Sequence, residues 1–166
     1  MPQQPTEELT TDRLVLTPLR IDDATEMVGV LSSNAIYSFT GGNPPEIEEL
    51  RGLYRSQVSG PPLGAELWHN WIIRLLDAGG AIGLVQATVI DNSADVAWIV
   101  APAWQRRGYA QEAANAMCDW LRLHGTVTIT AHIHPDHTAS NRVAAAVGLH
   151  ATDEVDPDGE IVWSSA

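Results

Sequence analysis

Lysine is absent from the sequence of 166 residues, and all nine basic residues are arginine. Enzymes that form a Schiff base use a lysine amine, and P-loop NTPases need the lysine of their phosphate-binding motif. Both classes are therefore excluded. Any anionic phosphate that binds this chain has to meet arginine side chains or backbone N–H groups instead.

Cysteine and long apolar runs are also scarce. Cys118 is the one cysteine, which excludes an intrachain disulfide and is typical of a reducing cytoplasm. No run approaches the ~20 apolar residues that cross a bilayer. We therefore expect a cytoplasmic protein with no membrane partner.

Basic residues are outnumbered, with 9 against 21 acidic ones and a formal net charge of −12. Nucleic-acid binders carry a basic face, so we expect no nucleic-acid partner. Net acidity is compatible with a cationic substrate such as an amine. The length fits one domain, which we place at residues 11–166 after a flexible tail at 1–10, in a monomer or homodimer.

The spacing of apolar residues predicts a mixed α/β order. Helices are expected at 22–31, 46–58, 108–124 and 138–147. Strands are expected at 13–19, 66–76, 81–90, 95–100, 126–133, 149–155 and 160–164. Hairpin turns join the three central strands into an antiparallel meander, and the helix from 108 crosses over to a parallel strand. This predicts a mostly antiparallel sheet of six to seven strands with about four helices.

The segment Gln105-Arg106-Arg107-Gly108-Tyr109-Ala110 joins a strand to a helix. A glycine at such a junction lets several unpaired N–H groups point at one spot, and the helix dipole makes that spot attractive to a diphosphate. Gly108 permits close approach of a ligand to the backbone, and the small Ala110 does so less completely.

This segment matches the Gln/Arg-x-x-Gly-x-Gly/Ala pattern of the GNAT superfamily of N-acetyltransferases, which the chain resembles. The resemblance implies transfer of an acetyl group from acetyl-CoA to a primary amine in a ternary complex. It implies that the backbone of residues 106–110 holds the coenzyme A pyrophosphate, next to Gln105. It also implies that Ile99 and Val100 bind the pantetheine arm through their main chain. The strands ending near 100 and 133 must then splay apart, leaving backbone groups for the cofactor.

Two further stretches resemble the RimJ/RimL-like branch, whose members acetylate protein N-termini and other amines. One is residues 9–19, and the other is residues 137–149. In the second, Ser140, Val143 and Gly148 match the branch, while His137 stands in place of an asparagine. Ser140 is therefore a candidate for contact with the cofactor.

Acyl transfer needs a neutral amine, a stabilised oxyanion and a proton for the departing thiolate. We predict His134 as general base and Ser140 as acid, with Glu66 and His69 as the next candidates for the base. An N–H near Val100 is the expected oxyanion donor. A histidine is a weak base, which favours an α-amine (pKa ~7.7–8.0) over a lysine (pKa ~10.4) as the acceptor.

Two alternatives remain open from the sequence. His132-Ile133-His134-Pro135-Asp136-His137 matches the His-x-His-x-Asp-His signature of metal-dependent hydrolases. Only His150 follows among histidines, so the downstream ligands of that family are missing and we expect no metal. The other alternative is a non-catalytic acyl-CoA-binding module, which would bind acetyl-CoA without turnover.

Overall fold

The computed structural model describes residues 4–62, 64 and 66–166. Its eight strands form one sheet in the order β1-β2-β3-β4-β5-β6-β8-β7, and all neighbours are antiparallel except β5 and β6. The strands are β1 Leu9–Thr10, β2 Leu14–Pro18, β3 Glu66–Leu75, β4 Ala81–Ile90, β5 Ser93–Val100, β6 Thr128–Ile133, β7 His150–Val155 and β8 Ile161–Ser164. This confirms the predicted mixed sheet.

Four α-helices flank the sheet: α1 Ala24–Val30, α2 Ile47–Ser59, α3 Tyr109–Leu123 and α4 Thr138–Ala146. Three short 3₁₀ helices are also present, η1 Ile21–Asp23, η2 Asn34–Tyr37 and η3 Pro102–Trp104. The first forms the start of the helix expected at 22–31, and the third lies in the expected loop after β5. Helix α2 begins at a capping box in which Glu46 and Glu49 satisfy each other's backbone N–H groups. Among the residues that the structure describes, no helix is long and apolar enough to cross a membrane.

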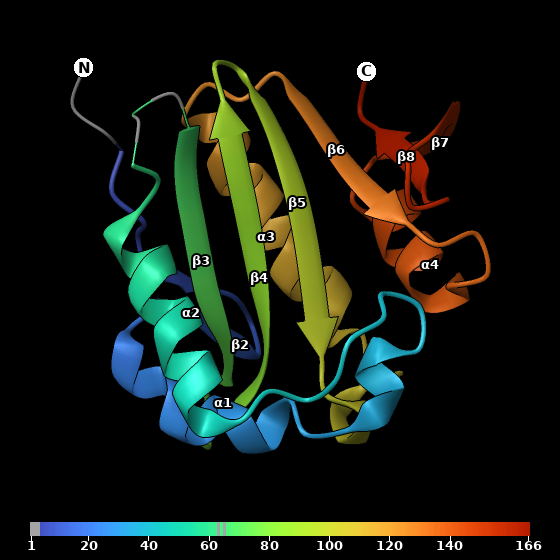
Figure 1. The fold of residues 1–166 in the computed structure, drawn as a ribbon. Helices are drawn as coiled ribbons and strands as arrows, with labels where there is room; N and C mark the ends of the chain where they lie inside the picture. Colours follow the sequence, from blue (N-terminus) through green and yellow to red (C-terminus); the bar gives the residue numbers. More distant parts are fainter. Residues whose placement is uncertain (1–3, 63, 65) are drawn as a thin grey trace.

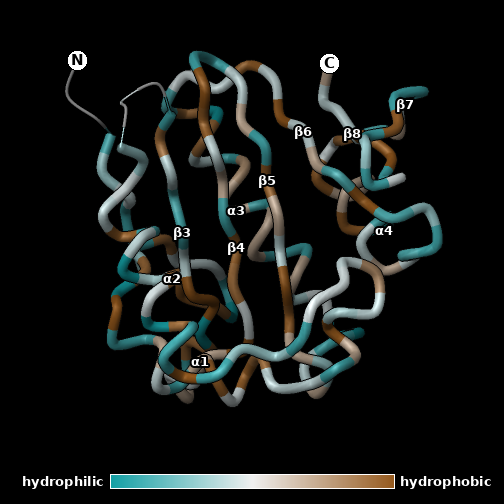
Figure 2. Tube along the Cα trace, in the orientation of Figure 1, coloured by the Kyte–Doolittle hydropathy of each residue, from teal (hydrophilic) through white to brown (hydrophobic). Residues whose placement is uncertain are grey.

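The helices lie on two opposite faces of the sheet (Figure 1). The larger hydrophobic core lies under α3 and α4 and includes Trp71, Met117 and Ile129, all fully buried. The smaller core lies under α1 and α2 and includes Leu50 and Ile72. Figure 2 shows hydrophobic residues recurring along the central strands that both cores share.

Strands β5 and β6 pair over only three residues each, 93–95 with 128–130, and then separate. Ala101 N–H donates to Ile82 O at 2.8 Å, so the main chain of Ala101 faces β4. In an antiparallel pair, every second residue points its N–H and C=O toward the same neighbouring strand. The main-chain groups of Ile99 therefore face β4. Those of Trp98 and Val100 face the gap between β5 and β6.

Gly83 of β4 lies opposite Val100, at the end of β5 that is separated from β6. A Cβ at this position would lie 2.1 Å from Ile99 O and 2.9 Å from Val100 Cα, both backbone atoms. We expect Gly83→Ala to lower the free energy of unfolding by about 1–3 kcal/mol, because the two strands must move apart. Gly29→Ala on α1 is the control: its Cβ meets nothing within 4 Å, so urea unfolding should show no loss of stability. Equal stability of the two variants would show that the backbones of Gly83 and Val100 do not lie this close together.

The expected tail at residues 1–10 is wrong for the part that the structure describes; residues 1–3 lie outside it. Leu9–Thr10 forms β1 on β2, and Trp71 Nε1 donates to Glu7 O at 2.7 Å. Trp120 Nε1 also donates to the Glu7 carboxylate, at 3.2 Å. These indole N–H groups point out of the larger core, and the N-terminal segment supplies their acceptors.

His69 is 3% exposed beneath this segment, with Nδ1 2.8 Å from Thr6 Oγ1. Burial, with a smaller contribution from nearby His124, lowers its pKa to about 4. The folded state therefore resists protonation that the unfolded chain accepts below pH ~6.5, so stability falls as the pH drops from there toward 4. We expect His69 to account for about 2 kcal/mol of lost stability between pH 7 and pH 5. In urea unfolding at both pH values, His69→Gln should lose about 2 kcal/mol less stability between pH 7 and pH 5 than the unmodified protein. An equal loss in the two proteins would show that His69 is not the group responsible.

Candidate active site

The loop between β5 and α3 is shaped by one side-chain bond and two unusual backbone positions. Gln105 Nε2 donates to Val100 O at 2.9 Å, which ties the loop to the end of β5. Arg106 and Gly108 have positive φ angles of 64° and 81°, and Gly108 is the N-cap of α3. Alternating turns of this kind point successive N–H groups into one concavity.

The backbone N–H groups of residues 106–111 donate to no group that the structure describes. The next N–H group along the chain, that of Glu112, is the first with a partner inside the protein; it donates to Gly108 O at 3.0 Å. A helix start with this many free donors binds anions, and the dipole of α3 adds to the attraction. These donors fit a diphosphate.

Arg13 of the β1–β2 connection supports the loop from the other side, which the sequence analysis missed. Its Nη1 donates to Arg107 O at 3.0 Å, and its Nε donates to Glu112 Oε1 at 2.7 Å. The guanidinium lies 4.4 Å from the centre of the Tyr109 ring. Burial alone would raise the pKa of Glu112, but hydrogen bonds from Thr11 and Arg13 lower it overall. The carboxylate thus stays charged and holds Arg13 in place.

The predicted acid, Ser140, lies on α4 beside the open half of β5. Trp98 Nε1 donates to Ser140 Oγ at 3.3 Å, and His137 Nε2 lies 3.3 Å from the same oxygen. Burial, followed by the charge of His134, lowers the pKa of His137, so this ring is neutral near pH 7. The serine thus has one fixed donor and one neutral imidazole as partners.

The predicted base, His134, is placed differently from expectation. Its Nδ1 accepts from Asp136 N–H at 3.1 Å, so in the neutral ring the proton is on Nε2. Phe39, from the connection between η2 and α2, packs against it with ring centres 5.2 Å apart and stacks on His137 at 4.5 Å. The nitrogen lone pair that a base needs is already engaged.

The His132–His137 signature does not converge into a metal site. His132 Nδ1 lies 2.8 Å from Asp156 Oδ2, and its Nε2 lies 3.7 Å from Asp95. Burial would lower the pKa of His132, but the hydrogen bond to Asp156 and the neighbouring carboxylates raise it. Over the described ranges, the grouping of ligand atoms close enough for a metal is Asp156, Asp158 and Glu160, without a histidine. The geometry therefore does not support the hydrolase alternative.

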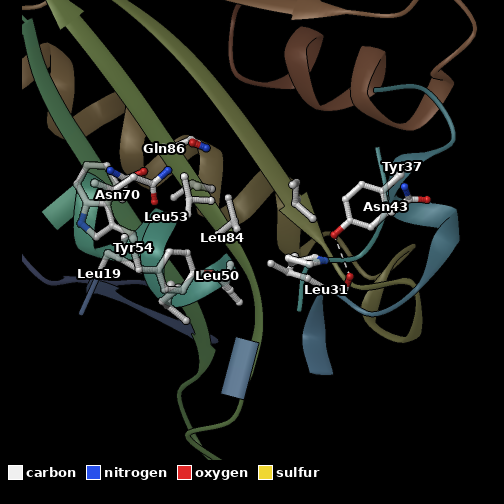
Figure 3. Close-up of a pocket in the computed structure, with 16 residues that line it drawn as sticks. Leu19, Leu31, Tyr37, Asn43, Leu50, Leu53, Tyr54, Asn70, Leu84 and Gln86 are labelled. Carbon is white, nitrogen blue, oxygen red and sulfur yellow. Dashed lines mark hydrogen bonds between the residues drawn. The ribbon is translucent and has the colours of Figure 1, made fainter. Parts of the chain in front are cut away.

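A cavity of about 290 Å³ opens on the other face of the sheet, between α2 and strands β3 to β5 (Figure 3). Ile99 of β5 reaches it with its side chain, so it adjoins the splayed region. A second cavity of about 200 Å³ continues past Trp68 and shares Leu53, Gln57, Asn70 and Gln86 with the first. We call the two together the acceptor groove.

Neither of the other candidates for the base lines this groove. Glu66 accepts a hydrogen bond from Trp68 Nε1 at 2.8 Å, and His69 is buried on the opposite face of the sheet. Cys118 is fully buried on α3, and burial raises the pKa of its thiol to about 11. A buried thiol of this kind is inert, so the cysteine belongs to the core.

Comparison with known proteins agrees with this geometry. Residues 13–150 match the family model described as the acetyltransferase (GNAT) domain. A comparison with curated proteins gave no match. Similar solved structures include an acetyltransferase (GNAT family) from Bacillus anthracis, with 18% identity, 95% of this chain and 97% of that chain covered, and a TM-score of 0.78.

An acetyltransferase from Agrobacterium tumefaciens is 21% identical, with coverage of 99% and 96% and a TM-score of 0.77. RimL, a ribosomal L7/L12 α-N-protein acetyltransferase solved with coenzyme A, is 13% identical, with coverage of 95% and 97% and a TM-score of 0.78. At these identities the solved structures show the fold, and the matched family model covers most of the chain. The chain therefore belongs to the GNAT acetyltransferase family.

Proposed function

We propose that the chain acetylates an α-amine, or another small amine of depressed pKa, by direct attack in a ternary complex. As a member of its family it is an acetyltransferase that moves an acetyl group from acetyl-CoA to an amine. The finer assignment to the RimJ/RimL-like branch rests on the sequence of residues 9–19 and 137–149. The free N–H groups at residues 106–111 support binding of acetyl-CoA, and the lack of a base among the described residues that line the acceptor groove favours an amine of depressed pKa.

The loop and the gap supply the binding of the cosubstrate. The N–H groups of residues 106–111 would hold the pyrophosphate, with Arg106 adding positive charge. In the gap, Trp98 presents its main-chain groups, so we assign the pantetheine contact to it and not to Ile99, whose main chain is paired with β4. The Val100 C=O accepts from Gln105 Nε2, which leaves its N–H for the thioester. Acetyl-CoA supplies the thioester carbonyl that the amine attacks.

Val100 and Ser140 are positioned for the charges that develop during transfer. The Val100 N–H faces the gap and has no ladder partner there, because β5 and β6 pair only as far as Asp95 and Thr130. It is therefore free to stabilise an oxyanion. Ser140 can pass its proton to the departing thiolate and take up the surplus proton that the amine nitrogen carries once the C–N bond has formed, so the hydroxyl is restored. The N–H of Trp98 holds the Ser140 oxygen in place during this transfer.

Among the residues that the structure describes, none that lines the acceptor groove is a base. Its titratable members are Tyr37 and Tyr54, and burial raises the pKa of both hydroxyls. His134 has its lone pair engaged by Asp136 N–H. The amine must therefore arrive largely neutral, which an α-amine does near pH 8 and a lysine does not.

A discontinuous assay with acetyl-CoA tests the proposal. The two acceptors are a peptide with a free N-terminus and no lysine, and its N-terminally blocked counterpart with one lysine. We expect acetylation of the first, with kcat/KM rising through an apparent pKa near that of the free α-amine. Preference for the blocked peptide would contradict the proposal. Binding of acetyl-CoA without turnover on either peptide would favour the non-catalytic alternative.

A further inference from the structure

We propose that the acceptor groove selects amines whose body is apolar, uncharged and joined to an amide beside the reacting amine. Amino acid amides and peptide N-termini with an apolar side chain have this chemistry. Asn70 and Gln86 are inferred to be the residues that recognise the amide. This inference rests on the proposed function, since it concerns the acceptor of the same reaction.

The groove is uncharged although the chain carries a net charge of −12. No residue lining either cavity, among those that the structure describes, is Asp, Glu, Arg or His. Of the nearby carboxylates, Asp23 and Glu26 pair with Arg74 at 3.0 and 2.6 Å, and Glu66 accepts a hydrogen bond from Trp68 Nε1 at 2.8 Å. The acidity of the chain therefore does not extend into the groove.

A second cationic group on the acceptor would find no partner in this groove. Moving an ammonium ion out of water without a counter-charge or hydrogen bonds is strongly unfavourable. The walls instead offer apolar side chains, including Leu50, Leu53 and Leu84 (Figure 3). Ile99 of β5 also lines the first cavity. Each methylene buried there contributes about 0.8 kcal/mol, which favours an aliphatic body.

The polar side chains that line the groove are hydroxyls (Tyr37, Tyr54, Ser56 and Thr88) and amides (Asn43, Gln57, Asn70 and Gln86). Asn70 and Gln86 are cross-strand partners on β3 and β4, so their side chains lie on the same face of the sheet (Figure 3). Both line the two cavities. Gln57 of α2 faces them from the helix. Within the described part of the chain, none of these three side chains makes a hydrogen bond. A free amide offers both a donor and an acceptor, which complements another amide.

The cavity size fits a small acceptor portion. About 290 Å³ is at the lower end of the range for small-ligand pockets, which is on the order of 300–1,000 Å³. The first cavity suits one apolar side chain, and the continuation past Trp68 leaves room for the chain that follows the amide. The reacting amine then lies toward Ile99, next to the gap.

The first test measures binding without catalysis. Isothermal titration of the protein with three acetylated products compares N-acetyl-leucinamide, N-isoamylacetamide and Nα-acetyl-lysinamide. The second lacks the carboxamide, and the third carries a charged side chain. We expect N-acetyl-leucinamide to bind about tenfold more tightly than either of the others. N-isoamylacetamide lacks one to two hydrogen bonds to the amides of the groove, and Nα-acetyl-lysinamide brings in a charge that has no partner there. Equal or tighter binding of Nα-acetyl-lysinamide would overturn the proposal.

The second test replaces one amide side chain of the groove with a carboxylate of the same shape. Gln86→Glu keeps the shape and adds a carboxylate, so the kcat/KM ratio of leucinamide to lysinamide should fall at least about tenfold. Asn92→Asp, in the exposed β4–β5 turn, adds the same charge outside the groove and should leave the ratio unchanged. An unchanged ratio in Gln86→Glu would overturn the assignment of that residue.

The two proposals fail in different ways. If leucinamide is acetylated but lysinamide is the better substrate of the unmodified enzyme, the inference on selectivity is wrong and the acetyltransferase proposal stands. If the three acetylated compounds bind in the expected order but neither leucinamide nor lysinamide is acetylated, the inferred selectivity of the groove stands and the proposed reaction is wrong.

Discussion

Replacement of Ser140 by alanine is expected to lower kcat by about 10²- to 10⁴-fold, the usual contribution of a positioned general acid. The hydroxyl has two partners in place, Trp98 Nε1 at 3.3 Å and His137 Nε2 at 3.3 Å. Because Trp98 can only donate, the serine O–H is left free to point toward the gap or the imidazole. Loss of the hydroxyl removes the proton source and leaves the binding loop intact.

The control for this variant is Thr138→Ala, an exposed position on the same helix. It should retain full kcat. For Ser140→Ala, the KM for acetyl-CoA should change little, and thiol release should be followed directly in steady-state and single-turnover assays. A Ser140→Ala enzyme with unchanged kcat would show that the thiolate leaves without help from this residue.

Replacement of Gly108 by aspartate is expected to weaken acetyl-CoA binding by about 100-fold or more. The residue has φ +81°, so any side chain is strained there, and an added Cβ would lie 3.4 Å from Arg13 Nη2. A carboxylate at this position would compete with Glu112 and Arg107 O for Arg13, and its charge beside the loop would repel the diphosphate. Loss of even two hydrogen bonds to a charged group, at about 1.5–3 kcal/mol each, gives this factor. The expected result is loss of both cofactor binding and activity.

Gly79→Asp separates this effect from general destabilisation. Gly79 also has a positive φ, 71°, and lies in the β3–β4 turn with nothing within 4 Å of an added Cβ. Both variants should lose similar stability in urea, and only Gly108→Asp should lose affinity for coenzyme A in a titration. Similar affinities for the two variants would place the pyrophosphate elsewhere.

The arrangement of strands and helices was predictable because its signals are local. The alternation of 81–90 and 95–100 and the stripe of Ala113, Met117 and Leu121 depend on sequence neighbours alone. The predicted strand at 126–133 and helix at 138–147 appear as β6 and α4. Strand β1 was missed because two residues carry no periodic pattern, and its pairing depends on Trp71 and Trp120 holding the segment in place.

The parts of the site that were missed depend on contacts between distant residues. The Arg13–Glu112 pair spans 99 positions, and Phe39 meets His134 and His137 only after folding. The orientation of Ile99 depends on strand register, and a shift of one residue would reverse it. The uncharged groove combines residues from three strands and a helix, so composition, with its net charge of −12, indicated the opposite character.

Thermal unfolding with and without acetyl-CoA measures most directly whether the loop at residues 105–110 binds the diphosphate of acetyl-CoA. At about 100 times the dissociation constant, binding should add ~2.7 kcal/mol to the stability of the chain. For a chain of this length that corresponds to a rise of about 5–10 °C in Tm. Coenzyme A should give a similar rise, and Gly108→Asp should give none. An unchanged Tm of the unmodified protein at millimolar acetyl-CoA would contradict the account.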